Sequence, residues 1–584
     1  MSKQLVPGLL VAVLAAVVLL PNLGGPPLWD EDEPRNAACS LAMRNSGDWV
    51  VPMFNGRLRV EKPALVNWIQ LAGFTVAGVN ETGARLGSAL LTLGTCLLTW
   101  RIATRLFRPD VGIWAGIVMA TCLWTGITGR AATPDAPLAF FTTLALWIVV
   151  RGMTPGSSRL GNGPVRLPIA TALGCGGACG LAVLTKGPVG LALPLMAVFG
   201  FAWWQASVDP GRTGPWHQRL LLAAASAWRG VRPFTITAAA LATAMPWYVL
   251  VTIRTDGAWL HEFLFVHNLG RFAAPMEGHS GSAFFYYPLV LLVGLFPWSM
   301  ASALIGRHAV LAVRNEGEST AGMRLVTAWI VAWVIPFSLA GTKLPGYVWP
   351  AYPAIACGIG LFVADWIQRP SRSTDGWMRW AWGFLVVSGI SLGIGLPLAT
   401  RQLTAGGEWI GLAGLLPLAG GLLASRFQMY SSRLAASGCW AATACGTVAI
   451  LVAAGPASLG RTGGTRHLIA RLPAEGIPQP IASYRAPAST SFYGGLIAAG
   501  GTVAELDEPA EVVAFVHNHP GAPLVVDARF ETQVAAELPD NYHVLRAVTV
   551  LPESRKLVLF GTTEPAGKPA RIADTELQPD SLRR

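Results

Sequence analysis

The residues best suited to chemistry lie in five polar segments that separate long apolar stretches of the chain. In chain order they are Asp32, Arg35, Glu61 and Lys62 in the first segment, Asp135 in the second, Lys186 in the third, His267 and Arg271 in the fourth, and Lys343 and Tyr347 in the fifth. An arginine can grip a phosphate with two parallel hydrogen bonds, and a lysine acts on it as a point charge. This mixture of cations and acids predicts a site for an anionic substrate that carries a phosphate.

The carboxylate of Glu61 does not fit such a site by itself, because it would repel an anion. A divalent metal ion held between Glu61 and a histidine would reconcile the two, since carboxylate oxygen and imidazole nitrogen are ordinary ligands for zinc or manganese. His267 is the favoured histidine because Arg271 follows it at i+4, on a shared helical face. His279 is a competing ligand. The cofactor expected here is therefore zinc or manganese, with magnesium as a further choice, acting as a Lewis acid on a departing phosphate.

Thirteen apolar stretches approach or exceed the ~17–20 residues that a helix needs to cross the hydrocarbon core of a bilayer. Only 13% of the residues are charged and 52% are hydrophobic, whereas a soluble chain of this length would need far more charged surface. The sequence predicts a polytopic α-helical membrane protein. The expected spans cover residues 7–23, 84–106, 112–128, 136–150, 168–184, 188–205, 233–252, 285–305, 323–341, 346–366, 377–399, 406–425 and 434–455.

Arginines gather in every second connection between these spans, beginning with Arg101 and Arg105 after the second span and Arg151 after the fourth. Short basic connections stay in the cytoplasm, so the polar segments are expected on the outer side. This orientation predicts a multi-pass protein of the cytoplasmic (inner) membrane, with its site and C-terminus outside the cytoplasm. The net charge of +11 then follows from topology, and no nucleic acid is expected as a partner.

Simpler readings of the same residues stay open. The acidic run around Asp32 is also what a solvated surface turn looks like, and Arg35 also fits a surface ion pair. Asp135 follows Pro134, and this pair is typical of a helix start. Lys186 also fits a lysine that extends along a helix end toward water.

The chain is expected to divide into three regions. Residues 1–455 form the transmembrane domain, with outer loops at 24–83, 129–135, 253–284 and 341–346. Residues 456–564 contain short strands at 481–484, 523–527 and 555–560 and a helix at 508–519, which predicts a small soluble α/β domain outside the cytoplasm. The tail 565–584 is rich in Pro, Arg and Asp, a composition typical of disorder.

A set of short motifs in fixed order resembles the ArnT-like and protein O-mannosyltransferase-like (PMT) group of GT-C glycosyltransferases, which use polyprenyl-phosphate sugar donors. The motifs are Asp32-Glu33-Pro34-Arg35, Ser46-Gly47-Asp48-Trp49, Glu61-Lys62-Pro63, Thr133-Pro134-Asp135, Lys186-Gly187-Pro188, Pro246-Trp247-Tyr248, His267-Asn268-Leu269-Gly270-Arg271-Phe272, Phe296-Pro297-Trp298 and Lys343-Leu344-Pro345-Gly346-Tyr347. The resemblance covers roughly residues 1–365 and implies a GT-C fold with about thirteen transmembrane helices.

The resemblance also implies a role for each site residue. Catalysis falls to Asp32, as the first-loop aspartate, and to Asp135, as the second acidic position. Metal binding falls to Glu61 and His267, and substrate binding to Arg35, Lys62, Lys186, Arg271, Lys343 and Tyr347. Two positions depart from the group's pattern. Asn36 stands where relatives often have tyrosine, and Arg59 replaces an aromatic residue just before the Glu61-Lys62-Pro63 motif.

The expected function is transfer of an aminoarabinose- or mannose-like sugar, with inversion, from a polyprenyl-phosphate donor such as undecaprenyl phosphate. The acceptor stays open among lipid A, another glycan and a protein hydroxyl. The expected partners are the donor, the acceptor and the bilayer, and the protein is expected to be a monomer. A flippase or transporter of a lipid-linked sugar is the alternative, although transporters tend to place ionisable groups near the middle of the membrane.

Overall fold

A computed structural model describes residues 2–29, 32–153, 163–208, 215–273, 284–315, 317–369, 371–403, 407–459, 464–470, 480–497, 503–550 and 555–562, together with 282 and 472. Its internal contacts divide the chain into two compact units. The first comprises Met1–Leu28 and Ser46–Arg461, and the second comprises Trp29–Asn45 and Thr462–Arg584.

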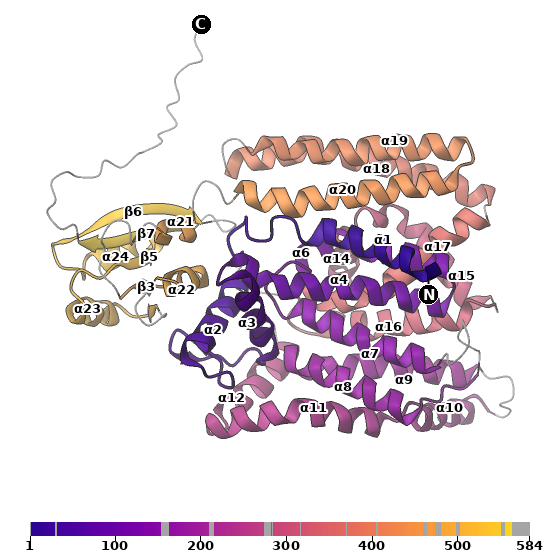
Figure 1. Ribbon diagram of the computed structural model, residues 1–584, viewed down its shortest axis with the longest axis horizontal. Coiled ribbons are helices and arrows are strands. Elements are labelled where there is room, and N and C mark those ends of the chain that lie inside the picture. Colours follow the sequence, from indigo (N-terminus) through magenta and orange to yellow (C-terminus); the bar gives the residue numbers. More distant parts are fainter. Residues whose placement is uncertain are drawn as a thin grey trace, which may run out of the picture. The chain divides into compact units, whose positions relative to one another are not determined.

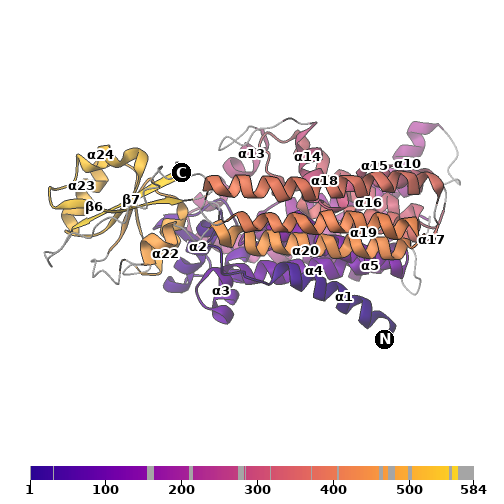
Figure 2. The ribbon, with the colours of Figure 1, turned by 90° about the horizontal axis from the view of Figure 1, so that it is seen from above.

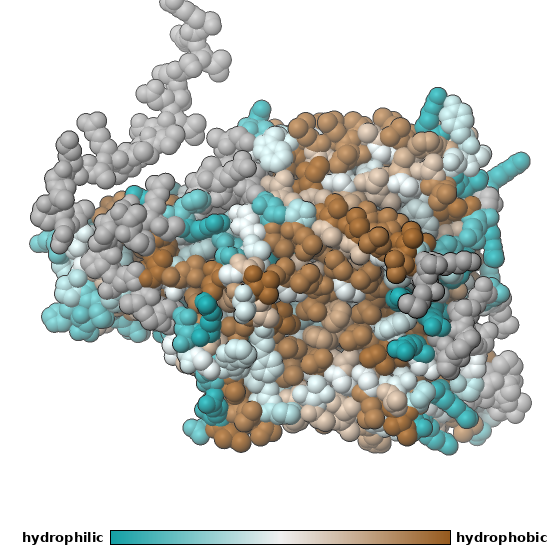
Figure 3. All heavy atoms as spheres, viewed as in Figure 1, coloured by the Kyte–Doolittle hydropathy of each residue, from teal (hydrophilic) through white to brown (hydrophobic). Residues whose placement is uncertain are grey.

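The first unit is a bundle of long helices that lie side by side (Figure 1). They are α1 (Ser2–Leu19), α4 (Glu81–Leu106), α5 (Pro109–Thr121), α6 (Leu123–Thr128), α7 (Asp135–Met153), α8 (Ile169–Lys186), α9 (Val189–Ser207), α11 (Pro233–Arg254), α14 (Tyr286–Gly294), α15 (Ser302–Arg314), α16 (Thr320–Leu339), α17 (Tyr352–Gln368), α18 (Arg372–Leu403), α19 (Leu415–Met429) and α20 (Arg433–Leu459). Apolar side chains cover the middle of these helices in the view of Figure 3, and hydrophilic ones gather near the helix ends. Such a surface suits a bilayer.

By length and composition, ten helices of the described part of the chain could cross a membrane, or eleven if one bent pair is a single span. The predicted fold class of a polytopic helical membrane protein is confirmed, but not every expected span is a straight crossing helix. The bent pair, Tyr286–Gly294 and Trp298–Arg314, turns by 115° inside the expected 285–305 span. The expected 112–128 span breaks between α5 and α6, because the backbone at Cys122 is extended. The apolar part of α1, Leu5–Leu19, falls short of a full crossing length.

The three last helices of the bundle, α18, α19 and α20, pack against one another in sequence (Figure 2), and α20 contacts α1, α5, α6 and α17 in the rest of the unit. Shorter elements join the long helices. They are β1 (Met53–Phe54), β2 (Arg57–Leu58), α3 (Leu65–Ala77), α10 (Trp216–Val231), α12 (Ala258–His261), the π-helical turn η1 (Glu262–Gly270), α13 (Arg271–Ala273), and the 3-10 turns η2 (Trp298–Ala301), η3 (Pro345–Ala351) and η4 (Glu408–Gly414).

Small residues let α8 approach its neighbour α11 closely. A side chain at Gly176 would come within 2.3 Å of the carbonyl oxygen of Ile236, and one at Gly180 within 2.6 Å of that of Ala240. The two helices therefore touch backbone to backbone, as small residues allow in membrane bundles.

The turn from α8 into α9 depends on glycine for a second reason. Gly187 has φ +86° and ψ −154°, a region that only glycine adopts readily. A Cβ atom there would also lie 2.6 Å from the ring of Phe263 in η1. Gly187 thus lets the C-terminal end of α8 pack on η1 while the chain turns into α9.

The second unit contains α2 (Asp32–Ser46) and a five-stranded sheet with strand order β4-β3-β5-β7-β6. Its strands are β3 (Ala482–Tyr484), β4 (Ala504–Leu506), β5 (Leu524–Asp527), β6 (Tyr542–Val550) and β7 (Arg555–Thr562), and its further helices are α21 (Thr465–Ala470), α22 (Ala488–Gly495), α23 (Pro509–Asn518), the 3-10 turn η8 (Ala528–Phe530) and α24 (Glu531–Ala535). The central strand β5 pairs in parallel with β3 and antiparallel with β7. All four of its residues are buried, as a central strand requires.

The predicted strands at 481–484, 523–527 and 555–560 and the helix at 508–519 are confirmed by β3, β5, β7 and α23. The boundary at residue 456 stays a prediction, and the contact-based division additionally groups Trp29–Asn45 with the C-terminal part of the chain. The predicted tail 565–584 lies outside the described residues.

We expect Gly187→Ala to lower the free energy of unfolding by about 1–3 kcal/mol, because alanine must adopt a strained backbone conformation and meet the Phe263 ring. Thermal unfolding of the detergent-purified protein measures this. Gly200→Ala is the matched control, because Gly200 lies within α9 and an added Cβ there has no atom within 4 Å. Equal melting temperatures for the two variants would contradict the role assigned to Gly187.

Candidate active site

A cavity of about 110 Å³ lies in the first unit where α8 ends, α9 begins and α16 ends. It draws its walls from four of the five polar segments. The predicted site residues that line it are Glu61, Lys62, Lys186, His267, Arg271 and Tyr347. These side chains are separated by up to several hundred residues in the chain, so the fold alone brings them together.

Asp135, from the remaining polar segment of this unit, reaches the cavity through Lys186. The ammonium of Lys186 donates a hydrogen bond to the Asp135 carboxylate and lies 4.8 Å from the ring centre of Tyr347. A Cβ atom on Gly346 would lie 3.2 Å from Oδ2 of Asp135, so the backbone of the fifth segment also approaches this carboxylate. Asp135 begins α7, as the Pro134-Asp135 pair predicts, and it also orients a cavity lysine.

The hairpin of β1 and β2 positions Glu61 and Lys62. Its turn residues Asn55 and Gly56 both have positive φ, which is typical of a two-residue Asn-Gly hairpin.

After the hairpin, the backbone N–H of Arg59 donates to the carbonyl of Pro52 at 2.9 Å. The indole N–H of Trp259 donates to the carbonyl of Arg59, also at 2.9 Å. The chain is therefore held on both sides just before Glu61.

An aromatic cluster is linked by hydrogen bonds to the segments on both sides of this hairpin. The ring of Trp259 stacks on that of Phe263 at 4.6 Å and meets that of Trp247 edge to face at 4.8 Å. Trp247 donates from its indole nitrogen to the carbonyl of Val50 at 3.0 Å. Aromatic pairs of this kind add to the stabilisation that comes from burying their area. They fasten the first polar segment to η1, which carries His267.

His267 lies in η1, and Arg271 is the first residue of α13. The amide of Asn268 donates to the carbonyl of Phe263 at 2.6 Å. The carbonyls of Arg271 and Phe272 accept hydrogen bonds from the backbone N–H groups of Thr342 and Gly341, at 3.1 Å and 2.8 Å. These backbone bonds join the fourth and fifth polar segments, so Arg271 and Tyr347 reach the same cavity.

Burial lowers the pKa of His267, and the positive charges of Arg271 and Lys62 act in the same direction, whereas Glu61 opposes them. The imidazole is therefore neutral at physiological pH. Its Nδ1 atom is buried and has no hydrogen-bond partner within the described part of the chain. A neutral ring with one available nitrogen can bind a metal ion or make a hydrogen bond to a substrate.

Glu61 has a cationic neighbour that the sequence did not predict. The Nε atom of Arg59 lies 3.5 Å from Oε2 of Glu61, and the Arg59 side chain is only 2% exposed. The sequence marked Arg59 only as a departure from the family pattern. An arginine two residues before a glutamate was the available signal, but spacing alone does not distinguish an ion pair from two side chains on opposite faces of an extended segment.

Lys343 lies elsewhere than its predicted phosphate-binding role requires. The residue is 4% exposed, and its ammonium donates to the carbonyls of Ser338 and Ala340, at 2.9 Å and 2.7 Å. It is not among the residues that line the cavity. A lysine beside the last carbonyls of a helix is favoured by hydrogen bonding and by the helix dipole, which explains this placement at the end of α16.

Asp32 and Arg35 belong to α2 in the second unit, so their predicted roles stay predictions. A local hydrogen bond forms at the start of this helix. The buried side chain of Glu33, 3% exposed, accepts it from the backbone N–H of Trp29 at 2.7 Å. His279, the competing metal ligand, lies outside the described residues.

A resident metal ion such as zinc is normally held by three or more donor side chains of the protein. No group of three or more His, Cys, Asp and Glu side chains suited to a metal occurs within the described residues. Glu61 and His267 offer two donors, but Nε of Arg59 lies 3.5 Å from Oε2 of Glu61, close enough for an ion pair although the two atoms make no hydrogen bond. A dication on that carboxylate would lie within roughly 6 Å of the guanidinium, and the repulsion would cost several kcal/mol even at an effective dielectric constant of about 20. The residues present therefore do not fit a resident metal.

Sequence reasoning also missed several cavity residues that carry no charge. Phe263, Asn268 and Thr342 line the cavity together with the side chains of Trp333 and Phe337 from α16. A motif can indicate charged groups, but apolar residues within a span look alike whether they face lipid, another helix or a cavity.

Known proteins of one group are similar to this chain in sequence. A family model described as dolichyl-phosphate-mannose-protein mannosyltransferase (PMT) matches residues 9–260. The undecaprenyl phosphate-alpha-4-amino-4-deoxy-L-arabinose arabinosyl transferase of Pseudomonas aeruginosa (strain PAO1) is 32% identical over 367 residues, which cover 62% of this chain and 60% of that protein. Its namesake from Enterobacter sp. (strain 638) is 28% identical over 361 residues, which cover 61% and 59% of the two chains. The chain thus spans less than two thirds of the length of these curated relatives.

Solved structures extend the likeness of fold over nearly the whole chain. ArnT from Cupriavidus metallidurans in the apo state superposes with a TM-score of 0.72 at 21% identity, covering 96% of this chain and 98% of that one. The oligosaccharyltransferase AglB from Archaeoglobus fulgidus superposes with a TM-score of 0.51 at 12% identity, covering 92% and 70%. The chain is thus similar to the PMT family model over its N-terminal part and to ArnT-like transferases over about three fifths of its length, and it shares the fold of ArnT.

Proposed function

We propose that this protein is an inverting glycosyltransferase that moves a sugar from a polyprenyl-phosphate donor to an acceptor at the outer face of the cytoplasmic membrane. The observation that carries the proposal is the cavity that Lys62, Lys186 and Arg271 line together. Three cations from three separate segments form a site for an anion at the helix ends. Charge-assisted hydrogen bonds from such groups are the usual means of holding a phosphate.

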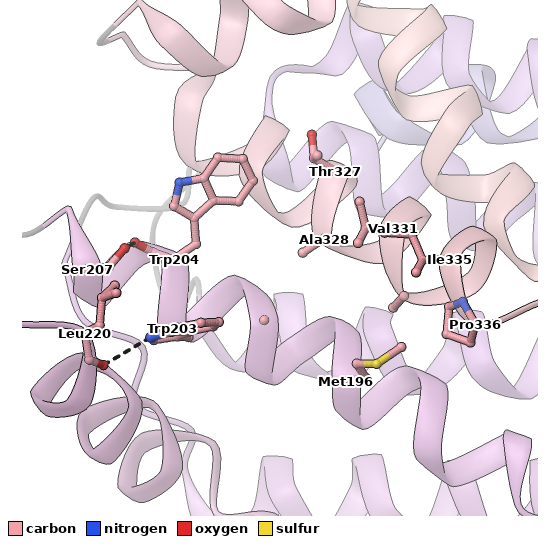
Figure 4. A pocket seen from close by; sticks show the side chains of 12 residues that line it. Met196, Trp203, Trp204, Ser207, Leu220, Thr327, Ala328, Val331, Ile335 and Pro336 are labelled. Atoms are coloured by element: carbon pink, nitrogen blue, oxygen red, sulfur yellow. Dashed lines mark hydrogen bonds between the residues drawn. The ribbon is translucent and has the colours of Figure 1, made fainter. Parts of the chain in front are cut away.

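A second cavity supports a substrate with a long apolar tail. It has a volume of about 420 Å³ and lies between α9 and α16, with Leu220 of α10 at one side (Figure 4). In Figure 4, Met196 and Trp203 of α9 face Ala328, Val331 and Ile335 of α16. Its walls are almost wholly apolar, as a polyprenyl chain requires.

The two cavities lie along one seam. Val189 and Leu193 of α9 and Trp333 and Phe337 of α16 line the cationic cavity, and residues further along the same two helices line the apolar one. We assign the phosphate of the donor to the cationic end and its polyprenyl chain to the apolar part. A solved structure titled as ArnT bound to undecaprenyl phosphate, with a TM-score of 0.70, supports this class of donor.

In the proposed reaction an acceptor oxygen attacks C1 of the sugar from the side opposite the lipid phosphate. The bond from C1 to the phosphate oxygen breaks, and its electron pair stays on that oxygen. Lys62, Lys186 and Arg271 stabilise the charge that develops there. Asp135 keeps Lys186 in position, and Tyr347 closes the cavity beside it. These groups act before the attack is complete, so they assist departure of the phosphate rather than activation of the acceptor.

Asp32 is the proposed general base when the acceptor is a hydroxyl. For an acceptor that is already anionic, such as a lipid A phosphate, Asp32 would orient the acceptor instead.

The curated relatives named above are aminoarabinose transferases, which favours that sugar on undecaprenyl phosphate. Lipid A, another glycan and protein serine or threonine are the acceptors to be tested. The same orientation places the C-terminal domain outside the cytoplasm.

Purified protein supplied with a radiolabelled sugar on synthetic polyprenyl phosphate tests the proposal directly. We expect label to move to one of three acceptor pools, namely lipid A, glycans or peptides.

In the same assay Asp32→Asn should lower kcat by about a hundredfold or more while donor binding is retained, because only proton transfer or acceptor orientation is lost. Asp48→Asn, in the same outer connection, is the control and should keep normal turnover. Intact donor that crosses the bilayer of proteoliposomes would favour a flippase instead.

Arg271→Gln should weaken binding of undecaprenyl phosphate by about tenfold to a hundredfold, since hydrogen bonds to charged groups contribute about 1.5–3 kcal/mol each. Quenching of tryptophan fluorescence on titration with undecaprenyl phosphate measures this. Arg254→Gln is the matched control, because Arg254 is half exposed and pairs with Asp48 at 2.7 Å instead of lining the cavity. Equal losses in both variants would argue against a specific phosphate contact.

Gly200→Leu should obstruct the apolar cavity, because Gly200 lines it and has open space at its Cβ position. We expect undecaprenyl phosphate to bind about tenfold less tightly, as overpacking of an apolar site costs about 1–3 kcal/mol. A short-chain geranyl phosphate should bind as well as before. Gly395→Leu in α18 is the control, since that glycine also has open space but lines neither cavity. Equal weakening of the long and short lipids by Gly200→Leu would remove the tail from this seam.

A further inference from the structure

Arg59 holds a position that neither its sequence motif nor the proposed reaction explains. The residue is 4% exposed, although arginine is rarely buried without a partner. Its Nε lies 3.5 Å from Oε2 of Glu61, which is an ion pair without a hydrogen bond between these two atoms. The backbone around Arg59 is fixed by hydrogen bonds to Pro52 and from Trp259. This is a rigidly placed cation directly beside a carboxylate that lines the cavity.

The charges around the cavity suit an anion without further help. Arg59 opposes Glu61, and Lys186 opposes Asp135. Lys62 and Arg271 bring two further positive charges to the cavity wall. Four cationic side chains thus accompany Glu61 and Asp135 at the cavity, and Glu262 also acts on the nearby His267. A divalent cation in the same place would add to an excess of positive charge, which disfavours its binding.

We propose that Arg59 occupies the electrostatic place of a divalent cation beside Glu61, so that this site holds its donor phosphate without a metal ion. The inference rests on the proposed function for the identity of the donor. Arg59 does not line the cavity and acts through Glu61, so it is a positioning residue. It neutralises the carboxylate that would otherwise repel the phosphate, and it fixes the direction of that side chain.

The metal content of the full-length purified protein tests this without any activity assay. Cells are grown with added zinc and manganese, the protein is purified without chelators, and bound metals are measured by mass spectrometry. We expect far less than one ion per wild-type chain, with no change in Glu61→Gln. Arg59→Gln should gain about one ion, because Glu61 and the available Nδ1 of His267 then become usable donors. The gain should vanish in the double variant with Glu61→Gln.

Two variants separate the charge of Arg59 from its bulk and from its neighbourhood. Arg59→Lys keeps a cation beside Glu61 and should stay free of metal. Arg57→Gln removes an exposed arginine from the same hairpin and should also stay free of metal. A second readout is binding of undecaprenyl phosphate in the presence of EDTA. The chelator should leave the wild type unchanged, whereas Arg59→Gln should bind about tenfold more weakly and be restored by zinc.

Close to one metal ion per wild-type chain, lost in Glu61→Gln, would overturn the inference. Metal-free wild type together with a folded Arg59→Gln that gains no metal would overturn it as well, because Arg59 would then be structural only. If Arg59→Gln does not fold, the comparison of wild type with Glu61→Gln and with Arg59→Lys still decides. Failure of every variant and of the wild type to bind undecaprenyl phosphate would reject the proposed donor, while the metal content would still judge the role of Arg59.

Discussion

A charged side chain surrounded by hydrocarbon costs several kcal/mol, so each charge near the ends of these helices must find a partner. Asp135 meets Lys186, Glu61 meets Arg59, and Lys343 meets the last carbonyls of α16. A charged side chain can bind a substrate here only if the other charges around it are already balanced by partners in the protein. Lys62 and Arg271 also line the cavity, so cationic side chains outnumber the acids there.

The same constraint separates the two kinds of contact that a lipid-linked sugar needs. Polar groups stay at the helix ends, and the middle of α9 and α16 carries apolar residues. Because the two helices run along each other over both cavities, one seam provides an anion site and an apolar site in sequence. If the proposed donor binds here, the helices that cross the bilayer also enclose its tail.

Hydrophobic periodicity and motif order predicted the helical membrane fold, the strands of the small sheet and the polar segments. They did not predict the bend of 115° between α14 and η2 or the break at Cys122, because backbone geometry inside an apolar run leaves little trace in composition. Charge type indicated which residues suit a phosphate, but not which partner each would choose. Lys343 therefore looked equivalent to Lys62, although backbone carbonyls lie close enough to take its ammonium. The pairing of Arg59 with Glu61 was hidden for the same reason.

The close contact of α8 with α11 has a consequence at a distance. Lys186 stands at the end of α8, and α11 leads through α12 into η1, which carries His267. Gly176 and Gly180 set the separation of the two helix axes in the middle of the membrane, well away from both side chains. The spacing between the elements that carry Lys186 and His267 is thus linked to two absent side chains deep in the bundle. Larger residues at these two positions would hold α8 and α11 further apart and so shift Lys186 away from η1.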